Sequence, residues 1–403
     1  MSFRVYGKLV ALSGVFKTTA IAFIATLAFA IYDFTLPIFT ENRAESFAIV
    51  GIIVSLVYVA SLLLEIPVGL AVDKYGRINI LLLAMTVLGL IGLVYFFVEN
   101  LILVAILSLI FGMFAVAFWI PSAVLVRDFS PRKMLGQAQG VYMSLTQVGW
   151  IFGPIVAGTI ATFFSDKHNF LLVWVLMFAA VGVGLAIFRG LKAKKFTKEE
   201  KGHKHKARLA LLAIILKEFL GIHKYAPPLY TLTLIVYMWI AIEWAFVPLA
   251  GITRFAFSEA GVGLVLGAMM AIEGALYYSS GFVMDKVGKR YIITAGFLIL
   301  FTSAYFMFLS TNPTVFVLSA LFAAAAVSWI LLTEILPANL YGEMSGVFDT
   351  SKDFGLIVGP FAGGLFATYL ANPLAPFLIV TIAAGIAALL AGWAFWPEKA
   401  KRK

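Results

Sequence analysis

The sequence contains no cysteine, and only four of its 403 residues are histidine. The absence of cysteine excludes disulfide bonds, thiolate metal sites and cysteine nucleophiles. The histidines all lie in hydrophilic stretches, which excludes a histidine-based site inside an apolar segment. Charged residues make up only 12% of the chain, and no G-x-x-x-x-G-K-[ST] phosphate-binding loop is present. We therefore expect neither an enzyme nor a bound metal or cofactor.

Hydrophobic residues, by contrast, make up 62% of the chain, and the mean hydropathy is +1.01. A soluble protein of this size cannot bury so much apolar surface, which indicates that a lipid bilayer is its solvent. Twelve apolar runs are each about twenty residues long, enough to cross a bilayer as helices. The sequence therefore predicts an all-α polytopic membrane protein with twelve transmembrane helices. They are centred near residues 28, 57, 89, 113, 149, 179, 238, 269, 300, 323, 357 and 385.

One long hydrophilic break divides these helices into two groups of six. It runs from Arg189 to Tyr225 and carries eleven basic residues. We expect an N-terminal six-helix bundle at 1–188, a cytoplasmic basic linker at 189–225 and a C-terminal six-helix bundle at 226–403. Within the linker, the apolar patch Leu209–Leu220 is a candidate helix lying along the membrane surface.

The basic residues predict the orientation of the chain. The net charge is +10, and lysine and arginine collect in alternate breaks and at both chain ends, whereas the opposite breaks hold only Arg43, Lys167 and Arg254. Cytoplasmic loops of membrane proteins collect basic residues, so this charge indicates a cytoplasmic side rather than binding to nucleic acid. We expect a multi-pass protein of the cytoplasmic membrane with both termini in the cytoplasm.

A repeat organises the chain. The first copy begins at Asp128 with D-F-S-P-R-K-M-L-G-Q-A-Q-G and ends at Gly158 with G-W-I-F-G-P-I-V-A-G. The second begins at Glu334 with E-I-L-P-A-N-L-Y-G-E-M-S-G and ends at Gly364 with G-L-I-V-G-P-F-A-G-G. The offset is constant at 206 residues (334 − 128 and 364 − 158), so the chain consists of two pseudo-symmetric copies of one unit.

A second signal recurs between the second and third and between the eighth and ninth predicted helices. In each copy two glycines and an aspartate precede a basic residue, which is typical of a tight polar turn. We expect Arg77 to pair with Asp128 and Arg290 to pair with Glu334, because these acids lie on the same membrane face in each half. The residues of this signal are Gly69, Asp73, Gly76, Arg77 and Asp128 in the first half and Gly281, Asp285, Gly288, Arg290 and Glu334 in the second.

With these motifs the chain resembles the major facilitator superfamily over essentially its whole length. Residues 69–77 and 281–290 look like the loop signature of that family, and residues 140–158 resemble the helix 5 signature of its drug:proton antiporter branch. The resemblance implies two six-helix bundles that rock around a central substrate site, with the loop signature as a cytoplasmic gate. The antiporter branch usually carries an arginine in helix 4, whereas residues 101–126 contain no arginine or lysine. That part of a proton-coupling mechanism is therefore not carried over.

The antiporter-like motif also has a physical meaning of its own. Gly149, Gly153 and Ala157 recur every four residues and predict a smooth helix face for close packing in lipid. Pro154 removes a backbone hydrogen bond and predicts a bend. The motif residues are Gly140, Gly149, Gly153, Pro154 and Gly158 in the first copy and Gly346, Gly355, Gly359, Pro360 and Gly364 in the second.

Charged residues inside the apolar helices indicate where protons or substrate bind, because a charge is costly in hydrocarbon. Two alternatives stay open. Asp349 is close enough to the cytoplasmic end to be hydrated, and Lys352 can form a structural ion pair with Asp353 or Asp349. The equivalent positions of the first copy are uncharged. The candidates for the proton and substrate cavity are Asp33, Glu243, Glu273, Asp349, Lys352 and Asp353, with the aromatic residues Tyr32, Trp150, Trp239 and Trp244 as candidates for contact with an organic cation.

We therefore expect a secondary active transporter that works by alternating access and exports small amphipathic or cationic compounds in exchange for protons. One alternative is proton-coupled uptake or exchange of an anionic, sugar-like or lipid-like solute, with Lys352 as the counter-charge. Another is a membrane receptor that does not transport, which would be expected to lose polar cavity residues rather than gain them. The expected partners are a small-molecule substrate, protons and membrane lipids, and we expect a monomer.

Overall fold

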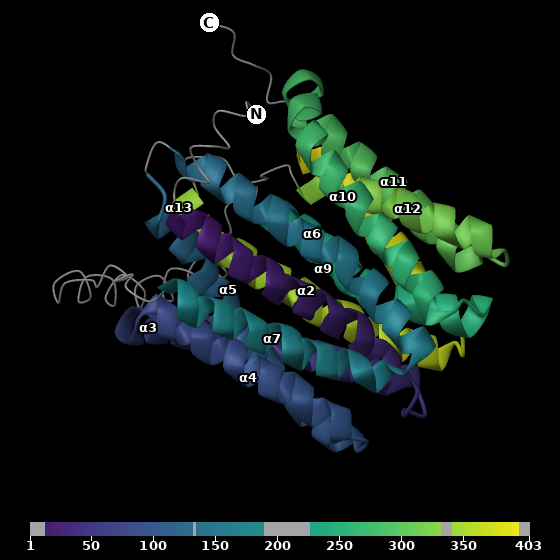
Figure 1. Cartoon of the computed structure of the whole chain (residues 1–403). Coiled ribbons are helices and arrows are strands. Elements are labelled where there is room, and N and C mark those ends of the chain that lie inside the picture. Colours follow the sequence, from purple (N-terminus) through teal and green to yellow (C-terminus); the bar gives the residue numbers. More distant parts are fainter. Residues whose placement is uncertain (1–12, 132–133, 189–225, 332–340, 395–403) are drawn as a thin grey trace, which may run out of the picture. The chain divides into compact units, whose positions relative to one another are not determined.

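The computed structural model of the chain describes residues 13–131, 134–188, 226–331 and 341–394. Every long element in these ranges is an α-helix (Figure 1). The predicted linker at 189–225, with its candidate surface helix, lies outside the described residues, as does Glu334. The side chains of 277–285, 289–290 and 341–349 also lie outside them, so Gly281, Asp285, Arg290, Gly346 and Asp349 are placed only as backbone positions on helices.

The chain forms two compact units. The first consists of residues 1–45, 56–203 and 257–267. Asn100 shows how one of its helices begins, because its Oδ1 accepts the backbone N–H groups of Ile102 and Leu103 at 2.8 and 3.3 Å. The helices of this unit are α2 (Ser13–Glu41), α3 (Phe47–Tyr75) from residue 56 onward, α4 (Arg77–Phe97), α5 (Leu101–Asp128), α6 (Leu135–Phe163), α7 (Asp166–Phe188) and the first residues of α10.

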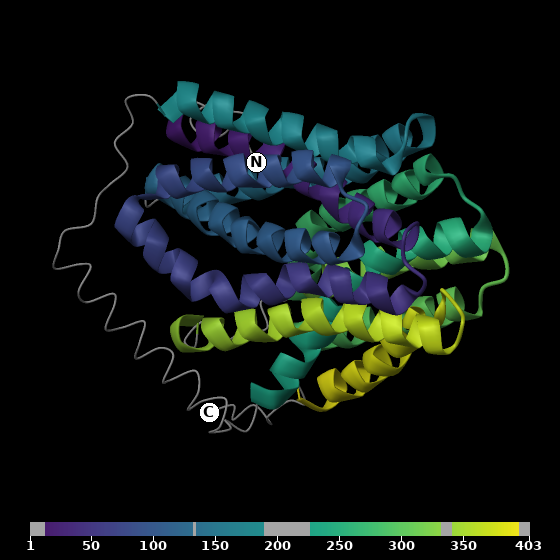
Figure 2. The same cartoon turned by 90° about the horizontal axis from the view of Figure 1, so that it is seen from below.

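The second unit consists of residues 46–55, 204–256 and 268–403. Its helices α13 and α14, drawn in yellow-green and yellow, run side by side at the lower edge of Figure 2. The helices of this unit are the start of α3, α9 (Ala226–Phe255), α10 (Glu259–Val287) from residue 268 onward, α11 (Lys289–Leu309), α12 (Pro313–Leu331), α13 (Tyr341–Tyr369) and α14 (Ala375–Ala394).

Eleven helices in the described part of the chain are long and apolar enough to cross a membrane. The predicted span that is not among them is α13, which has 29 residues but carries Asp349, Lys352 and Asp353 in its first half. These charges lower the mean hydropathy of the helix without shortening it. The assignment of α13 as a span therefore rests on its length and on its packing.

The two units repeat one packing order. In the first, α2 packs on α6 and α7, α7 packs on α4, and α4 packs on α5 (Figure 1). In the second, α9 packs on α13 and α14, α14 packs on α11, and α11 packs on α12. These pairs correspond one to one in chain order, with α13 in the place of α6. The all-α fold with a repeated unit, which the sequence predicts, is confirmed.

The turn within this signal, between the two helices that it joins, is one residue long in both copies. Gly76 alone separates α3 from α4, and Gly288 alone separates α10 from α11. Their dihedral angles are nearly identical, with φ 94° and ψ 143° at Gly76 and φ 95° and ψ 141° at Gly288. A residue with a Cβ is strained at such a positive φ. Glycine is therefore required at both turns, as the sequence predicts.

The glycine face of the antiporter-like motif packs against the central helix of each unit. A Cβ on Gly153 would overlap the Cβ of Ala30 in α2, and one on Gly149 would lie 3.0 Å from the backbone nitrogen of Leu27. In α13, a Cβ on Gly359 would lie 2.5 Å from the backbone oxygen of Met238 in α9. The predicted close packing is confirmed at these positions. Gly140 differs, because nothing lies within 4 Å of where its Cβ would be.

The last glycine of each motif copy meets the start of another helix. A Cβ on Gly158 would overlap the carbonyl of Glu259, the first residue of α10. Next to this contact the Ala260 N–H donates to Thr162 Oγ1 at 2.9 Å. The second unit repeats the bond, because the Ala48 N–H at the start of α3 donates to Thr368 Oγ1 at 2.8 Å. Each threonine thus satisfies a backbone donor that a helix start leaves unpaired.

Two cations at the opposite end from the turn signal are paired with acids. Arg43 Nη1 lies 3.1 Å from Asp166 Oδ2, and Lys167 forms an ion pair with Glu99. The hydrogen bond from Lys167 and its positive charge lower the pKa of the exposed Glu99 carboxyl. The few basic residues that the sequence places at this end of the first unit are therefore neutralised locally.

Candidate functional site

Two glutamates of the second unit lie near the middle of membrane-spanning helices. Glu273 is fourteen residues from each end of α10, about 21 Å along the helix in either direction. Glu243 is seventeen residues from the start and twelve from the end of α9. A helix of about twenty residues spans the hydrocarbon core of a bilayer, so both carboxyls are far from water at the membrane surfaces. This agrees with the predicted positions near mid-membrane.

Both glutamates are buried, and they lie close enough to interact electrostatically. The exposed fraction is 0% for Glu243 and 7% for Glu273. The charge of the Glu273 carboxyl acts on that of Glu243, and the Trp239 indole lies one helical turn before Glu243 on the same face. Neither carboxyl oxygen of Glu243 has a hydrogen-bond partner among the described residues, and neither does Oε1 of Glu273. The structure therefore brings together two of the predicted cavity acids.

An arrangement of this kind favours shared protons. A buried carboxylate is costly unless a cation or hydrogen-bond donors compensate its charge. Two carboxyls that interact directly titrate as a pair, and like charges oppose ionisation of both at once. Buried acids of this kind can hold a proton or can bind the positive charge of a ligand. Hydrolysis or group transfer would need a nucleophile and an oxyanion site, for which the pair supplies no geometry.

Ser351 and Lys352 of α13 lie against α9. Ser351 donates a hydrogen bond to the carbonyl of Tyr230 at 2.7 Å, and Lys352 Nζ lies 6.0 Å from the centre of the Tyr237 ring. Asp353 is 4% exposed, so its carboxyl is inside the unit, whereas Lys352 is half-buried. The side chain of Asp349 is outside the described residues. Lys352 thus lies at the α9–α13 contact, and Asp353 is buried next to it in the chain.

Asp33 belongs to the first unit. It is half-buried on α2, and it interacts electrostatically with the hydroxyls of Tyr58 on α3 and Tyr32 on α2. Sequence reasoning missed Tyr58, because it is one of 15 tyrosines and lies in an uninterrupted apolar run. Asp33 is the one acid of the predicted cavity set in this unit.

The predicted cavity aromatics prove to be mainly core residues. Tyr32 is fully buried, stacks on Phe111 at 3.5 Å between ring centroids, and shares a hydrogen bond of 3.1 Å with the Tyr95 hydroxyl. Trp239 is also fully buried, and Trp244 is 8% exposed. These rings contribute to packing, because a large aromatic ring buries much apolar area in a core.

Trp150 differs from the other three predicted aromatics because it is only half-buried. It is half-buried and lies nearly parallel to Trp119 of α5, with 6.4 Å between ring centroids and 12° between planes. Trp119 in turn stacks on Phe29 at 5.3 Å. No pattern in the sequence distinguished Trp119 from the other aromatic residues.

The first copy of the turn signal forms the predicted ion pair. Arg77, the first residue of α4, pairs with Asp128, the last residue of α5, and it also interacts electrostatically with Asp73. Arg77 is only 7% exposed, although the Asp128 side chain is 24% exposed. The pair ties the ends of α4 and α5 together. Its counterpart, Arg290 with Glu334, lies outside the described residues.

We expect Arg77→Ala to destabilise the purified protein by about 1–3 kcal/mol, because it removes a largely buried charge and leaves Asp128 without that partner. The unfolding midpoint in detergent measures the effect. Adding Asp128→Ala should recover part of the loss, since Asp128 is then no longer left without its cation. Arg127→Ala is the matched control, because Arg127 directly precedes Asp128 in the chain and its side chain is exposed. A loss in Arg127→Ala as large as in Arg77→Ala contradicts the stabilising role of the pair.

A comparison with protein-family models identifies the family to which the chain belongs. The model of the Major Facilitator Superfamily matches residues 18–249 and again residues 229–403. The chain belongs to the Major Facilitator Superfamily. The resemblance inferred from the motifs is therefore confirmed, and the two matches together span both copies of the six-helix repeat.

Relatives of this superfamily member are transporters. An uncharacterized MFS-type transporter of Methanocaldococcus jannaschii is 24% identical over 85% of this chain and 88% of its own length. The riboflavin transporter RibZ of Clostridioides difficile is 27% identical, and the multi-drug resistance efflux pump PmrA of Streptococcus pneumoniae is 32% identical. Each of these two matches covers 36% of this chain, with 32% of RibZ and 37% of PmrA.

A solved structure shows the same fold. A bacterial homologue of the human lysosomal transporter Spinster, in an inward-facing and occupied conformation, superposes with a TM-score of 0.76 at 13% identity. The alignment covers 95% of this chain and 98% of that one. Together with the family model and the MFS-type relative, this shows that the chain is a multi-pass membrane transporter and not an enzyme, as the sequence predicts.

Proposed function

We propose that this transporter exports small amphipathic cations in exchange for protons, by alternating access of one site to the two sides of the membrane. The observation that carries the proposal is the pair Glu243–Glu273, two buried acids near mid-membrane that interact with each other and leave three carboxyl oxygens without hydrogen bonds. The partial similarity to PmrA, named as a multi-drug resistance efflux pump, is consistent with it.

The proton and the substrate compete for the same carboxyls. A cation that binds beside Glu243 and Glu273 stabilises their ionised form and displaces the protons that they share. Protonation removes the negative charge and weakens the hold on the cation. On the acidic side of a membrane the pair loads protons and releases the cation, and on the other side the exchange reverses. The proton gradient thereby drives export.

The decisive experiment is gradient-driven transport by the wild-type protein in liposomes. With an acidic lumen and a neutral medium, ethidium should accumulate inside the proteoliposomes, because protons leave as the dye enters. Ethidium is permanently charged, so it cannot follow the pH gradient as a neutral base. Accumulation should stop when a protonophore collapses the gradient, and protein-free liposomes are the control. Dye entry at the same rate with and without the gradient contradicts proton exchange.

A second candidate function is exchange or uptake of an anionic solute, favoured by the half-buried Lys352 next to the Tyr237 ring. The same vesicles distinguish it when carboxyfluorescein replaces ethidium. Gradient-dependent movement of this anion that is lost in Lys352→Ala and kept in Lys286→Ala would replace the leading proposal. Lys286 is the suitable control because it is exposed at the end of α10.

Location, partners and assembly complete the proposal. The excess of lysine and arginine at the chain ends and in alternate loops supports a cytoplasmic membrane location with both termini in the cytoplasm. The turn signal with the Arg77–Asp128 pair then acts as a gate on the cytoplasmic side. Protons are the coupling ion without any bound cofactor, and one chain carries both copies of the repeat, so a monomer suffices.

A further inference from the structure

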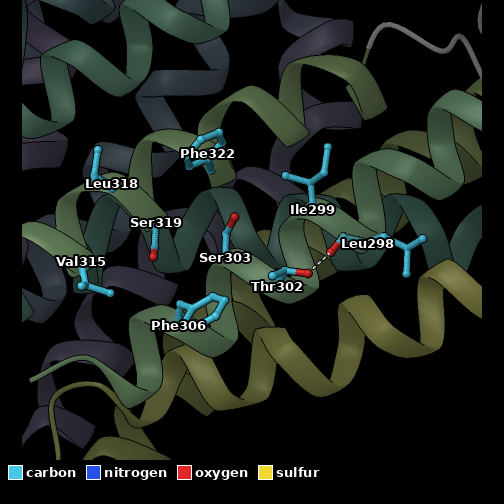
Figure 3. A pocket seen from close by; sticks show the side chains of 9 residues that line it. All are labelled: Leu298, Ile299, Thr302, Ser303, Phe306, Val315, Leu318, Ser319 and Phe322. Atoms are coloured by element: carbon cyan, nitrogen blue, oxygen red, sulfur yellow. Dashed lines mark hydrogen bonds between the residues drawn. The ribbon is translucent and has the colours of Figure 1, made fainter.

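A groove of the second unit lies between α11 and α12, away from the acids discussed above (Figure 3). It encloses about 500 Å³, which falls within the range of about 300–1,000 Å³ typical of small-molecule sites. Both helices are membrane spans by length and composition. The groove is lined by Leu298, Ile299, Thr302, Ser303, Phe306, Val315, Leu318, Ser319 and Phe322, none of which is charged.

The hydroxyls of two serines in this groove have no hydrogen-bond partner among the described residues. Ser303 on α11 is 5% exposed and Ser319 on α12 is 8% exposed, and within the described part of the chain neither forms a hydrogen bond. Serine and threonine in helices commonly bond a carbonyl of the preceding turn. Their neighbour Thr302 does so, donating to the Leu298 carbonyl at 2.8 Å. Figure 3 shows Ser303 and Ser319 side by side in the middle of the groove, between Phe306 and Phe322.

The two hydroxyls also lie at the same depth in the membrane. Ser303 lies six residues before the end of α11 at Leu309, and Ser319 lies six residues after the start of α12 at Pro313. Each is about 9 Å from the helix end that faces the short connection between α11 and α12. They are therefore below the polar surface and inside hydrocarbon, where water does not satisfy them.

The rim of the groove is open to the surroundings of the helices. Leu298, Leu318, Phe306 and Phe322 are 51%, 52%, 50% and 62% exposed. In a bilayer these side chains contact lipid tails, so the groove is entered sideways from the membrane. Its occupant must be apolar along most of its length, must carry no charge, and must place one hydrogen-bonding oxygen at the depth of the two serines.

We propose that the α11–α12 groove binds an uncharged, lipid-soluble molecule with an elongated apolar chain and a single hydroxyl or carbonyl oxygen, held by Ser303 and Ser319. The chain lies along Leu298 and Phe322, and the oxygen lies between the two hydroxyls. This site is separate from Glu243 and Glu273 and needs no proton gradient, so it stands or fails independently of the proposed export.

The test is photolabelling of the full-length protein in lipid nanodiscs with hexadecanol that carries a diazirine in its chain. Mass spectrometry should locate the label on α11 and α12, and excess unlabelled hexadecanol should suppress it. Ser303→Ala with Ser319→Ala should reduce the labelling about fivefold or more, the factor expected for the loss of a hydrogen bond. Thr302→Val is the matched control, because it removes a groove hydroxyl that is already bonded within the helix.

Thermal unfolding separates this proposal from a structural role of the serines. Since the hydroxyls have no internal partner, the double alanine variant should be at least as stable as the wild type without hexadecanol, and should lose the stabilisation that hexadecanol confers. A marked loss of stability in that variant, or labelling equal to wild type, overturns the proposal. So does a groove protected from label by a second copy, which cross-linking between copies would reveal.

Discussion

Glu273→Gln should reduce gradient-driven ethidium transport at least about tenfold, a loss that corresponds to about 1.4 kcal/mol or more of coupling. Glutamine has nearly the shape of glutamate, but it neither binds an exchangeable proton nor attracts a cation. The remaining Glu243 then lacks the neighbouring acid with which, in our proposal, it shares protons. Glu243→Gln should have the same effect, because each acid depends on the other. Initial rates in proteoliposomes with an acidic lumen measure both variants.

Two controls test whether a loss of transport is specific to the Glu243–Glu273 pair. Glu259→Gln removes an acid from the same helix, but at its half-exposed first residue, and should leave transport unchanged. The unfolding midpoint of Glu273→Gln should stay within a few degrees of wild type, because no hydrogen bond to Oε1 is lost. Undiminished gradient-driven transport in both glutamine variants would exclude this pair as the proton site, while leaving the family assignment intact.

Gly158→Ala should destabilise the protein by about 1–3 kcal/mol, the usual cost of inserting a methyl group into a packed site. The added Cβ overlaps the backbone carbonyl of Glu259, which cannot move aside by changing a rotamer. The displacement also strains the neighbouring bond from the Ala260 N–H to Thr162 Oγ1. Gly364→Ala should act in the same way on Phe47 in the second unit. The unfolding midpoint and the yield of monodisperse protein measure the effect.

Gly140→Ala is the matched control, because Gly140 belongs to the same motif and nothing lies within 4 Å of its Cβ position. Alanine favours a helix over glycine by about 0.5–1 kcal/mol, so this variant should be equally or slightly more stable. If Gly140→Ala and Gly158→Ala lose stability equally, the close approach of α6 to the start of α10 is not what the motif glycine provides.

The Arg77–Asp128 pair and the glycine motif show how much local sequence patterns can predict. Arg77 and Asp128 were paired from the sequence alone, because the two loops that carry them lie on one membrane face. The requirement for glycine at Gly76 and Gly288 also followed from a turn too short for other residues. The difference between Gly140 and Gly158 did not follow, since both are glycines of one motif and only the approach of α2 or α10 separates them.

The sequence by itself determined the number and order of the spans, the two-fold repeat, the family and the helices that carry buried charge. It could do so because a bilayer demands long apolar runs and makes every charge within them conspicuous. The tertiary structure alone decided that Glu243 and Glu273 come together, that Tyr32 is core, and that Ser303 and Ser319 share a groove. Lipid tails are as apolar as a helix interface, so the pattern of apolar residues does not reveal which face of such a helix meets protein. That choice is made only when the helices pack.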